Sequence, residues 1–210
     1  MNASANREPP ATEITALQSQ IEQLQVYRRA MEAQDELIRA LISMSQVATG
    51  RLMIKSMLRQ AAKMTGQITA AQECSLFLFD ESGKVSESLL ARGPTMQEDK
   101  EILIGEVLDK GLAGWVVRHR HVGLIADTQK DDRWINLLNQ PYQVRSALCV
   151  PLLRGKALLG LITLTHCEPN HFTPEIARVM ELCSMPLALV FDNARFMGAT
   201  MSSSTNRQTL

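Results

Sequence analysis

The chain has 210 residues, of which 45% are hydrophobic, and its 22 basic residues balance its 22 acidic residues. This length suits one domain with an extension, and the apolar content is enough for a buried core. The zero net charge argues against a general affinity for nucleic acid or anionic membranes. No apolar run in the sequence is long enough to span a bilayer, and residues 1–10 lack the apolar segment of a secretory signal, so we expect a cytoplasmic protein.

The N-terminal region is expected to be a disordered segment followed by a helical stalk. Residues 1–11 are polar and contain adjacent prolines, which predicts disorder. Residues 12–49 are rich in good helix formers, with Thr12 as the N-cap. A heptad pattern predicts a coiled-coil seam that pairs the stalk into a parallel homodimer, with these residues at its a and d positions: Ile14, Leu17, Ile21, Leu24, Met31 and Ile38.

The seam does not extend over the whole stalk. Arg28 and Asp35 fall at a positions, where polar residues reduce stability but can fix the register. Further along, a shifted apolar stripe could instead pack on the terminal helices of the chain's own domain, and it consists of Leu37, Leu41, Met44 and Ala48. Both uses of the stalk stay open at this point.

The rest of the chain predicts an α+β fold with a largely antiparallel sheet. A helix from residue 51 should end at Gly66, where glycine is a common C-terminal stop. Period-two apolar patterns and turn residues then predict strands at residues 74–79, 85–92, 122–127, 146–153 and 157–165, with a helix at 97–110. Thr173 should cap a last helix, which Pro186 should kink or break near Met185 and Gly198 should end, before a disordered tail at 198–210.

The stretch "DKGLAGWVVRHRH" (109–121) contains two glycines three residues apart. It lacks the Lys-Ser/Thr pair of a phosphate-binding loop and follows a predicted helix instead of a strand. Its spacing favours a short helix with Leu112, Trp115 and Val116 on one face, while Gly111 allows the turn and Gly114 allows close approach to the sheet. We therefore interpret the stretch as structural, with Trp115 pointing into the domain.

Three blocks of the sequence together resemble a GAF domain. They are "GLAGWVVRHRHVGLIADTQKDDRW", "VRSALCVPLLRGKALLGLITLTH" and "HFTPEIARVMELCSMPLALVFDNA", and they occur in the family's order. The resemblance assigns residues 50–197 to the domain and is strongest to GAF domains of bacterial, particularly cyanobacterial, signalling proteins. It implies a central antiparallel sheet with helices on one face and, on the other, a ligand pocket roofed by loops and short helices.

The residues that define known GAF subclasses are absent from the matching positions. Cyclic-nucleotide GAF domains carry an acidic pair after a phenylalanine, whereas Phe172 is followed there by Ile176 and Ala177. Bilin GAF domains need a thiol in the segment that here spans residues 135–146, which holds no Cys or His, so we expect no covalent bilin. The methionine sulfoxide reductase branch uses a cysteine where this chain has Ala113, so we expect no enzyme. For haem, His121 is the one ligand worth testing, and we expect no cofactor.

The sequence also contains candidate reactive thiols and metal ligands. The four cysteines form no Cys-x-x-Cys pair and are expected to be buried thiols in a reducing compartment, with Cys167 the more exposed. A potential ligand set lies in "HCEPNH", namely His166, Cys167, Glu168 and His171. Because no second Cys or His pair accompanies it, as a structural zinc site usually requires, the interpretation is an ordinary loop and no metal is expected.

The sequence therefore predicts a noncatalytic signalling module that senses a small molecule and acts through dimerisation and a downstream partner. The expected pocket combines apolar walls with polar edges: Leu76, Leu78, Trp115, Ile125, Asp127, Trp134, Tyr142, Arg145, Ser146 and Leu148. Arg145 could pair with a carboxylate or phosphate of a ligand. Alternatively, the tryptophans fill the pocket, Arg145 pairs with Asp131 or Asp132, and the domain is a ligand-free protein-interaction module.

Overall fold

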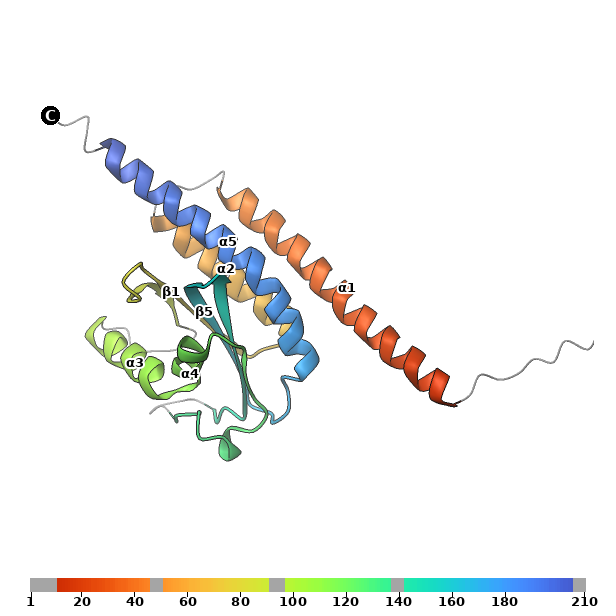
Figure 1. Cartoon of the computed structure of the whole chain (residues 1–210). Coiled ribbons are helices and arrows are strands. Elements are labelled where there is room, and N and C mark those ends of the chain that lie inside the picture. The colour runs from red at the N-terminus through yellow and green to blue at the C-terminus, as the bar shows by residue number, and fades with distance from the viewer. Residues whose placement is uncertain (1–10, 46–50, 91–96, 137–141, 206–210) are drawn as a thin grey trace, which may run out of the picture.

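The computed structural model describes residues 11–45, 51–90, 97–136 and 142–205. The elements follow one another as α1 (Ala11–Ser45), α2 (Arg51–Thr69), β1 (Glu73–Phe79), β2 (Val85–Leu89), α3 (Gln97–Lys110), α4 (Leu112–His119), β3 (Gly123–Ile125), the 3-10 turn η1 (Thr128–Lys130), β4 (Ser146–Arg154), β5 (Ala157–His166) and α5 (Pro174–Thr205). Figure 1 shows the long helices on one side of the sheet and the short α3 and α4 on the other. The predicted α+β class and the predicted strand and helix order are confirmed.

The sheet has five strands in the order β2-β1-β5-β4-β3, and every neighbouring pair is antiparallel. Two hairpins, β1–β2 and β4–β5, arise from short turns with Gly83 and Gly155 in the left-handed region of backbone space, which glycine adopts without penalty. The long strand β5 lies in the centre and pairs Leu76 with Ile162 on one side and Leu164 with Leu148 on the other.

Alternating side chains of the strands feed two separate apolar cores. On one face, Leu76, Leu148 and Leu164 pack with α2 and α5, including Met57 and Phe191. The residues that alternate with these face α3 and α4 on the other side of the sheet. They are Phe77, Phe79, Ile125, Ala147, Cys149 and Leu161. The period-two geometry of a strand assigns neighbouring residues to opposite cores.

Helix α2 does not end at Gly66 as predicted but continues to Thr69. The left-handed residue that terminates it is Ala70, with φ of 52°, and the Ala71 N–H donates to the Gly66 carbonyl at 3.1 Å. This geometry is that of a left-handed C-terminal cap, which glycine usually provides. The predicted end at Gly66 was wrong because an alanine, Ala70, takes the left-handed capping position in place of a glycine.

Helix α5 is not broken at Pro186, and it passes Gly198, where we expected it to end, to reach Thr205. Thr173 does cap it, since its Oγ1 accepts the Ile176 N–H at 3.3 Å. A proline removes one helical hydrogen bond, but burial of Leu187, Ala188 and Phe191 against the sheet holds the following turn in helical form.

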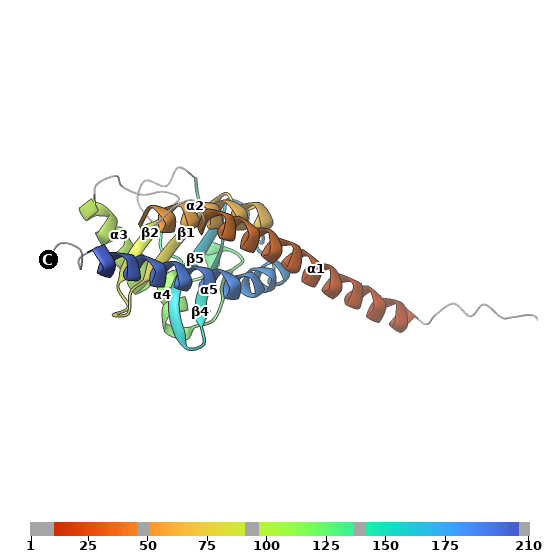
Figure 2. The ribbon, with the colours of Figure 1, turned by 90° about the horizontal axis from the view of Figure 1, so that it is seen from above.

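Helix α1 lies against α5 and α2 in the same direction as α5, and its N-terminal end extends beyond them (Figures 1 and 2). The Arg178 guanidinium of α5 donates to the Tyr27 hydroxyl at 2.9 Å, and its central carbon lies 5.6 Å from the centre of the Tyr27 ring. The expected stalk is therefore partly packed on its own domain. The predicted irregularity at Gly50, together with residues 1–10, lies outside the described residues. Within the described part, no helix has the length and apolar character needed to cross a membrane.

Candidate ligand site on the α3–α4 face of the sheet

Helix α4 is held close to the end of α3, and this position sets the location of Trp115. Gly111 adopts an extended conformation as its N-cap, and Arg120 closes it in the left-handed region with its N–H bonded to the Val116 carbonyl. A Cβ on Gly114 would lie 2.1 Å from the carbonyl oxygen of Leu108, so only glycine fits at this contact. The predicted close approach is present, but it is made to α3 instead of the sheet.

Trp115 lies in a stack of aromatic and cationic groups. The His119 ring stacks on it with centroids 4.4 Å apart, and the Arg133 guanidinium carbon lies 5.0 Å from its ring centre, a cation–π distance. Asp131 holds Arg133 through bonds of 2.9 Å to Nε and 2.6 Å to Nη2, and the latter also donates to the Leu124 carbonyl. Arg133 was not among the predicted site residues. The sequence did offer one signal, because Asp131 and Arg133 lie two residues apart in "DDRW", where they can form an ion pair.

Trp134 packs against the same apolar cluster as Trp115, and its indole nitrogen is buried. Its backbone N–H donates to the Asp131 carbonyl, and its side chain packs on the cluster that contains Ile125 and Phe77. Its indole Nε1 is buried, and among the described residues it has no hydrogen-bond acceptor. A buried donor without an acceptor is unfavourable by about 1–3 kcal/mol, so this atom is a natural binding point for an acceptor.

Arg145 and Asp127 form a two-bond ion pair at the edge of this face. Nε donates to Oδ1 at 3.1 Å and Nη2 to Oδ2 at 3.0 Å. The hydrogen bond from Arg145 is the main cause that lowers the pKa of Asp127, and the same bond raises the pKa of Arg145. Asp127 also caps η1 by accepting the Gln129 N–H. Arg145 is thus paired, as the alternative interpretation expected, but with Asp127 instead of Asp131 or Asp132.

The remaining predicted pocket residues are divided between different places. Leu76, Leu78 and Leu148 face α2 and α5, on the opposite side of the sheet from both tryptophans. The buried Ser146 donates to the Glu168 carbonyl at 2.8 Å, and the Tyr142 hydroxyl lies 3.3 Å from Thr165 Oγ1. The structure therefore brings together Trp115, Trp134 and Ile125, whereas the Asp127–Arg145 pair lies where β3 ends and β4 begins.

The cysteines and the candidate haem ligand His121 were the other reactive groups that the sequence suggested. Burial raises the pKa of Cys149 to about 12, so this thiol, which packs beneath α4, stays protonated. Burial likewise raises the pKa values of Cys74 and Cys183 to about 11 each. Ala113, at the position where the reductase branch has its cysteine, is buried in α4, and His121 is exposed.

Comparison with known proteins identifies the family. The GAF domain model matches residues 54–191, more than half of the chain, so this protein belongs to the GAF family, whose members are mostly regulatory and sensory domains. No curated protein matches the chain.

Solved structures share the fold at low sequence identity. The GAF domain of an Acinetobacter phosphoenolpyruvate-protein phosphotransferase is 17% identical with a TM-score of 0.58, covering 80% of this chain and 95% of that one. The corresponding domain from Coxiella burnetii is 19% identical with a TM-score of 0.58, covering 81% and 98%. Free methionine-R-sulfoxide reductase from Neisseria meningitidis is 14% identical with a TM-score of 0.55, covering 77% and 90%. At these identities the likeness concerns the fold alone.

Proposed function

We propose that this protein is a noncatalytic signalling module that binds a small molecule noncovalently on the α3–α4 face and acts as a parallel homodimer on a downstream partner. The observation that carries the ligand-binding part is the buried indole N–H of Trp134, which has no acceptor among the described residues. A ligand that accepts this hydrogen bond would remove the unfavourable free energy of the buried donor.

The charges around Trp134 indicate the class of ligand. Arg145 and Arg133, the two guanidinium groups at this site, each make a two-bond ion pair with a neighbouring aspartate. An anionic ligand would have to displace one of these carboxylates. The arrangement therefore supports a largely apolar or aromatic ligand that carries a hydrogen-bond acceptor, held by one N–H and by the tryptophan rings.

A thermal-shift screen of nucleobases, nucleosides, amino acids, nitrate and tetrapyrroles on the full chain tests this proposal, because a ligand that binds the folded state raises the melting temperature. For a compound that binds, Trp134→Phe keeps an aromatic ring but removes the donor, and should weaken affinity by at least roughly 2–10-fold, the range for one hydrogen bond. Trp115→Phe is the matched control for loss of an indole on the same face.

The competing function is that of a ligand-free protein-interaction module. Packing of both tryptophans on the apolar cluster beneath α4 favours it, because such clusters are commonly core. If no compound in the screen shifts the melting temperature, the ligand-sensing proposal fails in favour of this alternative.

The exposed side of α1 supports the homodimer. Leu24 and Met31 are 67% and 70% exposed in the single chain, and three more apolar seam residues are also exposed: Ile14, Leu17 and Ile21. On α5, Met185 and Leu189 are 69% and 53% exposed, and their spacing places them on one helical face with Arg178. Ile38, the last predicted seam residue, is already partly buried. A second copy of α1 would cover the exposed seam in the manner of a coiled coil.

Light-scattering mass of the full chain tests the dimer. Leu24→Arg places a charge in the seam and should shift the protein toward monomer, whereas Ser19→Arg lies on the opposite face of α1 and should leave the dimer intact. A monomeric parent chain would contradict the proposal, as would a Leu24→Arg variant that dimerises as strongly as the parent.

A further inference from the structure

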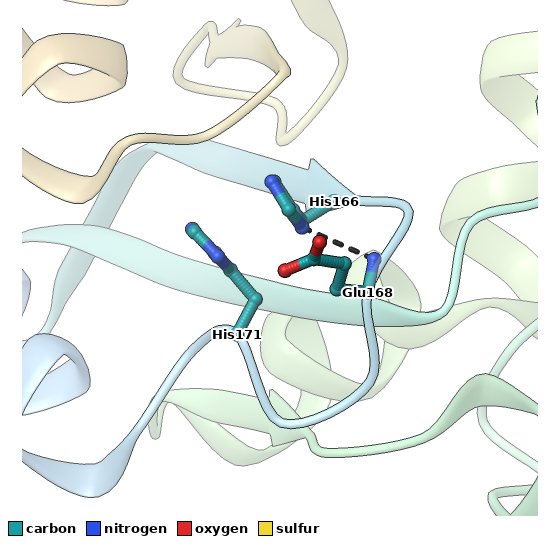
Figure 3. A group of neighbouring side chains, drawn as sticks. All are labelled: His166, Glu168 and His171. Atoms are coloured by element: carbon teal, nitrogen blue, oxygen red, sulfur yellow. Dashed lines mark hydrogen bonds between the residues drawn. The ribbon is translucent and has the colours of Figure 1, made fainter.

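A cluster of three metal-ligating side chains lies outside the proposed ligand site, on the loop that joins β5 to α5. His166, Glu168 and His171 come together there, with their candidate ligand atoms all within 4.8 Å of one another (Figure 3). Glu168 is exposed and the two histidines are partly buried, so the cluster can be reached from solvent. The sequence predicted an ordinary loop here, because it contains no second pair of cysteines or histidines.

The backbone that carries these residues is tied to three other parts of the domain. The Cys167 N–H donates to the Gln72 side chain at 2.8 Å, and the Glu168 carbonyl accepts the Ser146 hydroxyl at 2.8 Å. The Asn170 N–H donates to the Ala126 carbonyl at 2.7 Å, while Asn170 itself adopts the left-handed conformation that turns the loop back. Because the loop is fixed at these points, the three side chains are presented from a defined backbone.

His171 is oriented as a metal ligand would be. Its Nε2 lies 3.0 Å from the carbonyl oxygen of Thr69, which can only accept a hydrogen bond, so Nε2 carries the proton and Nδ1 has the free lone pair. Metal-binding histidines commonly donate their other ring N–H to a backbone carbonyl in this way. Thr69 is the last residue of α2, so the contact also links the cluster to that helix.

His166 presents its Nδ1 lone pair to the backbone N–H of Glu168 at 3.1 Å, and its ring stacks on His171 with centroids 3.6 Å apart. A coordinated ion lies near the plane of each imidazole, so two stacked rings cannot both direct lone pairs at one ion. Binding therefore requires the His166 ring to turn about its Cβ–Cγ bond and exchange the Glu168 N–H for the ion, while the loop backbone keeps its bonds.

We propose that His166, Glu168 and His171 form a binding site for a divalent transition-metal ion, with zinc as the best match. Two neutral imidazoles and one carboxylate suit zinc and its neighbours, whereas calcium and magnesium prefer oxygen ligands. Three protein ligands leave a fourth position of the tetrahedron for water. The ion would cross-link the end of β5 to the loop that precedes α5, which goes beyond the small-molecule site on the opposite face of the sheet.

Calorimetric titration of the full chain with zinc tests the site. We expect one ion per chain and a melting temperature that rises with zinc concentration. Glu168→Gln removes the charged ligand at an exposed position without threatening the fold, and should weaken binding at least as much as loss of an outer-shell partner does, roughly 10-fold. The His166→Gln and His171→Gln double variant should abolish binding.

The matched control is the double variant His119→Gln and His121→Gln, which removes the chain's other two histidines and should bind zinc as the parent does. Loss of binding in this control, or unchanged binding in Glu168→Gln, would overturn the assigned ligand set. Cobalt substitution adds an optical readout, since a sulfur-to-cobalt charge-transfer band would show that Cys167 replaces Glu168 as ligand and would also overturn it. Absence of any zinc binding to the parent chain would reject the site.

Discussion

The two faces of the sheet are built differently. The face toward α2 and α5 is an apolar core whose polar neighbours are internally bonded, as when Thr65 and Thr69 donate to carbonyls one turn earlier in α2. The face toward α3 and α4 holds the tryptophans, the buried donor of Trp134 and two Asp–Arg pairs within reach of solvent. One face is therefore an internally satisfied core, and the other is the face on which we propose that a ligand binds.

On the α2–α5 face of the sheet, polar contacts also join helix α5 to the strands. Asp192 of α5 is buried and pairs with Arg154 at the end of β4, and Arg195 donates to the Phe79 carbonyl at the end of β1. A buried carboxylate depends on such a partner, because an unpaired charge is strongly disfavoured away from water. Helix α5 is thus fixed to β1 and β4, and it is also packed against α1.

The largest loss of stability should come from opening a cavity on the α2–α5 face of the sheet. Phe191→Ala removes a side chain that is 1% exposed and should lower the free energy of unfolding by about 3–5 kcal/mol. Urea denaturation measures this loss. Both tryptophans lie on the other face, so the emission spectrum of the folded variant should match that of the parent. A changed emission maximum would show that the two faces are not separable.

A smaller effect, with the opposite spectroscopic signature, should follow a change between α3 and α4. Gly114→Ala forces a Cβ against the Leu108 carbonyl and should destabilise by about 1–3 kcal/mol while shifting the tryptophan emission, because Trp115 moves with α4. The control is Gly105→Ala in α3, where a Cβ meets nothing within 4 Å. This substitution should stabilise the helix by about 0.5–1 kcal/mol. Equal losses in the two variants would contradict the close contact.

The smallest effect concerns the Asp127–Arg145 pair and its dependence on pH. Because the folded state lowers the pKa of Asp127, chiefly through the hydrogen bond from Arg145, the pair stabilises the fold above the ordinary aspartate pKa of 3.8. That contribution disappears as the pH falls below this value and through the lowered pKa. The urea midpoint of Asp127→Asn should therefore fall less than that of the parent between pH 6 and pH 3. A parallel decline in both proteins would show that the pair contributes nothing measurable.

Much of the fold could be predicted because local signals agreed with the tertiary structure. The turn at Gly155 between two apolar runs fixed the β4–β5 hairpin, and Thr173 followed by Pro174 marked the start of α5. The end of α2 was missed because an exposed alanine, Ala70, takes the left-handed position that glycine usually occupies, and α5 continues past Pro186 where packing of the next turn overrides the local signal.

The site was harder to predict because its residues come from strands buried on both faces. In "CSLFLF" nearly every residue is apolar, so alternation cannot show which side chains face α4, and Leu76 and Leu78 were assigned to the wrong face. The partner of Arg145 depends on how η1 folds back on β4, which no local pattern encodes. The proximity of His166 and His171 likewise required the left-handed turn at Asn170.

The directions of the three long helices have an electrostatic consequence. α1 and α5 run the same way along one side of the domain, and α2 runs against both (Figure 1). Parallel neighbours point their macrodipoles the same way, whereas the antiparallel α2 places its negative end near the positive end of α5, and α1 begins beyond both. Glu175 adds a negative charge at the start of α5, while the last turn of α5 has no basic residue. The C-terminal end of α2 and Glu175 therefore both compensate the positive end of α5, and salt, which screens this attraction, should weaken the packing of α2 on α5 more than that of α1 on α5.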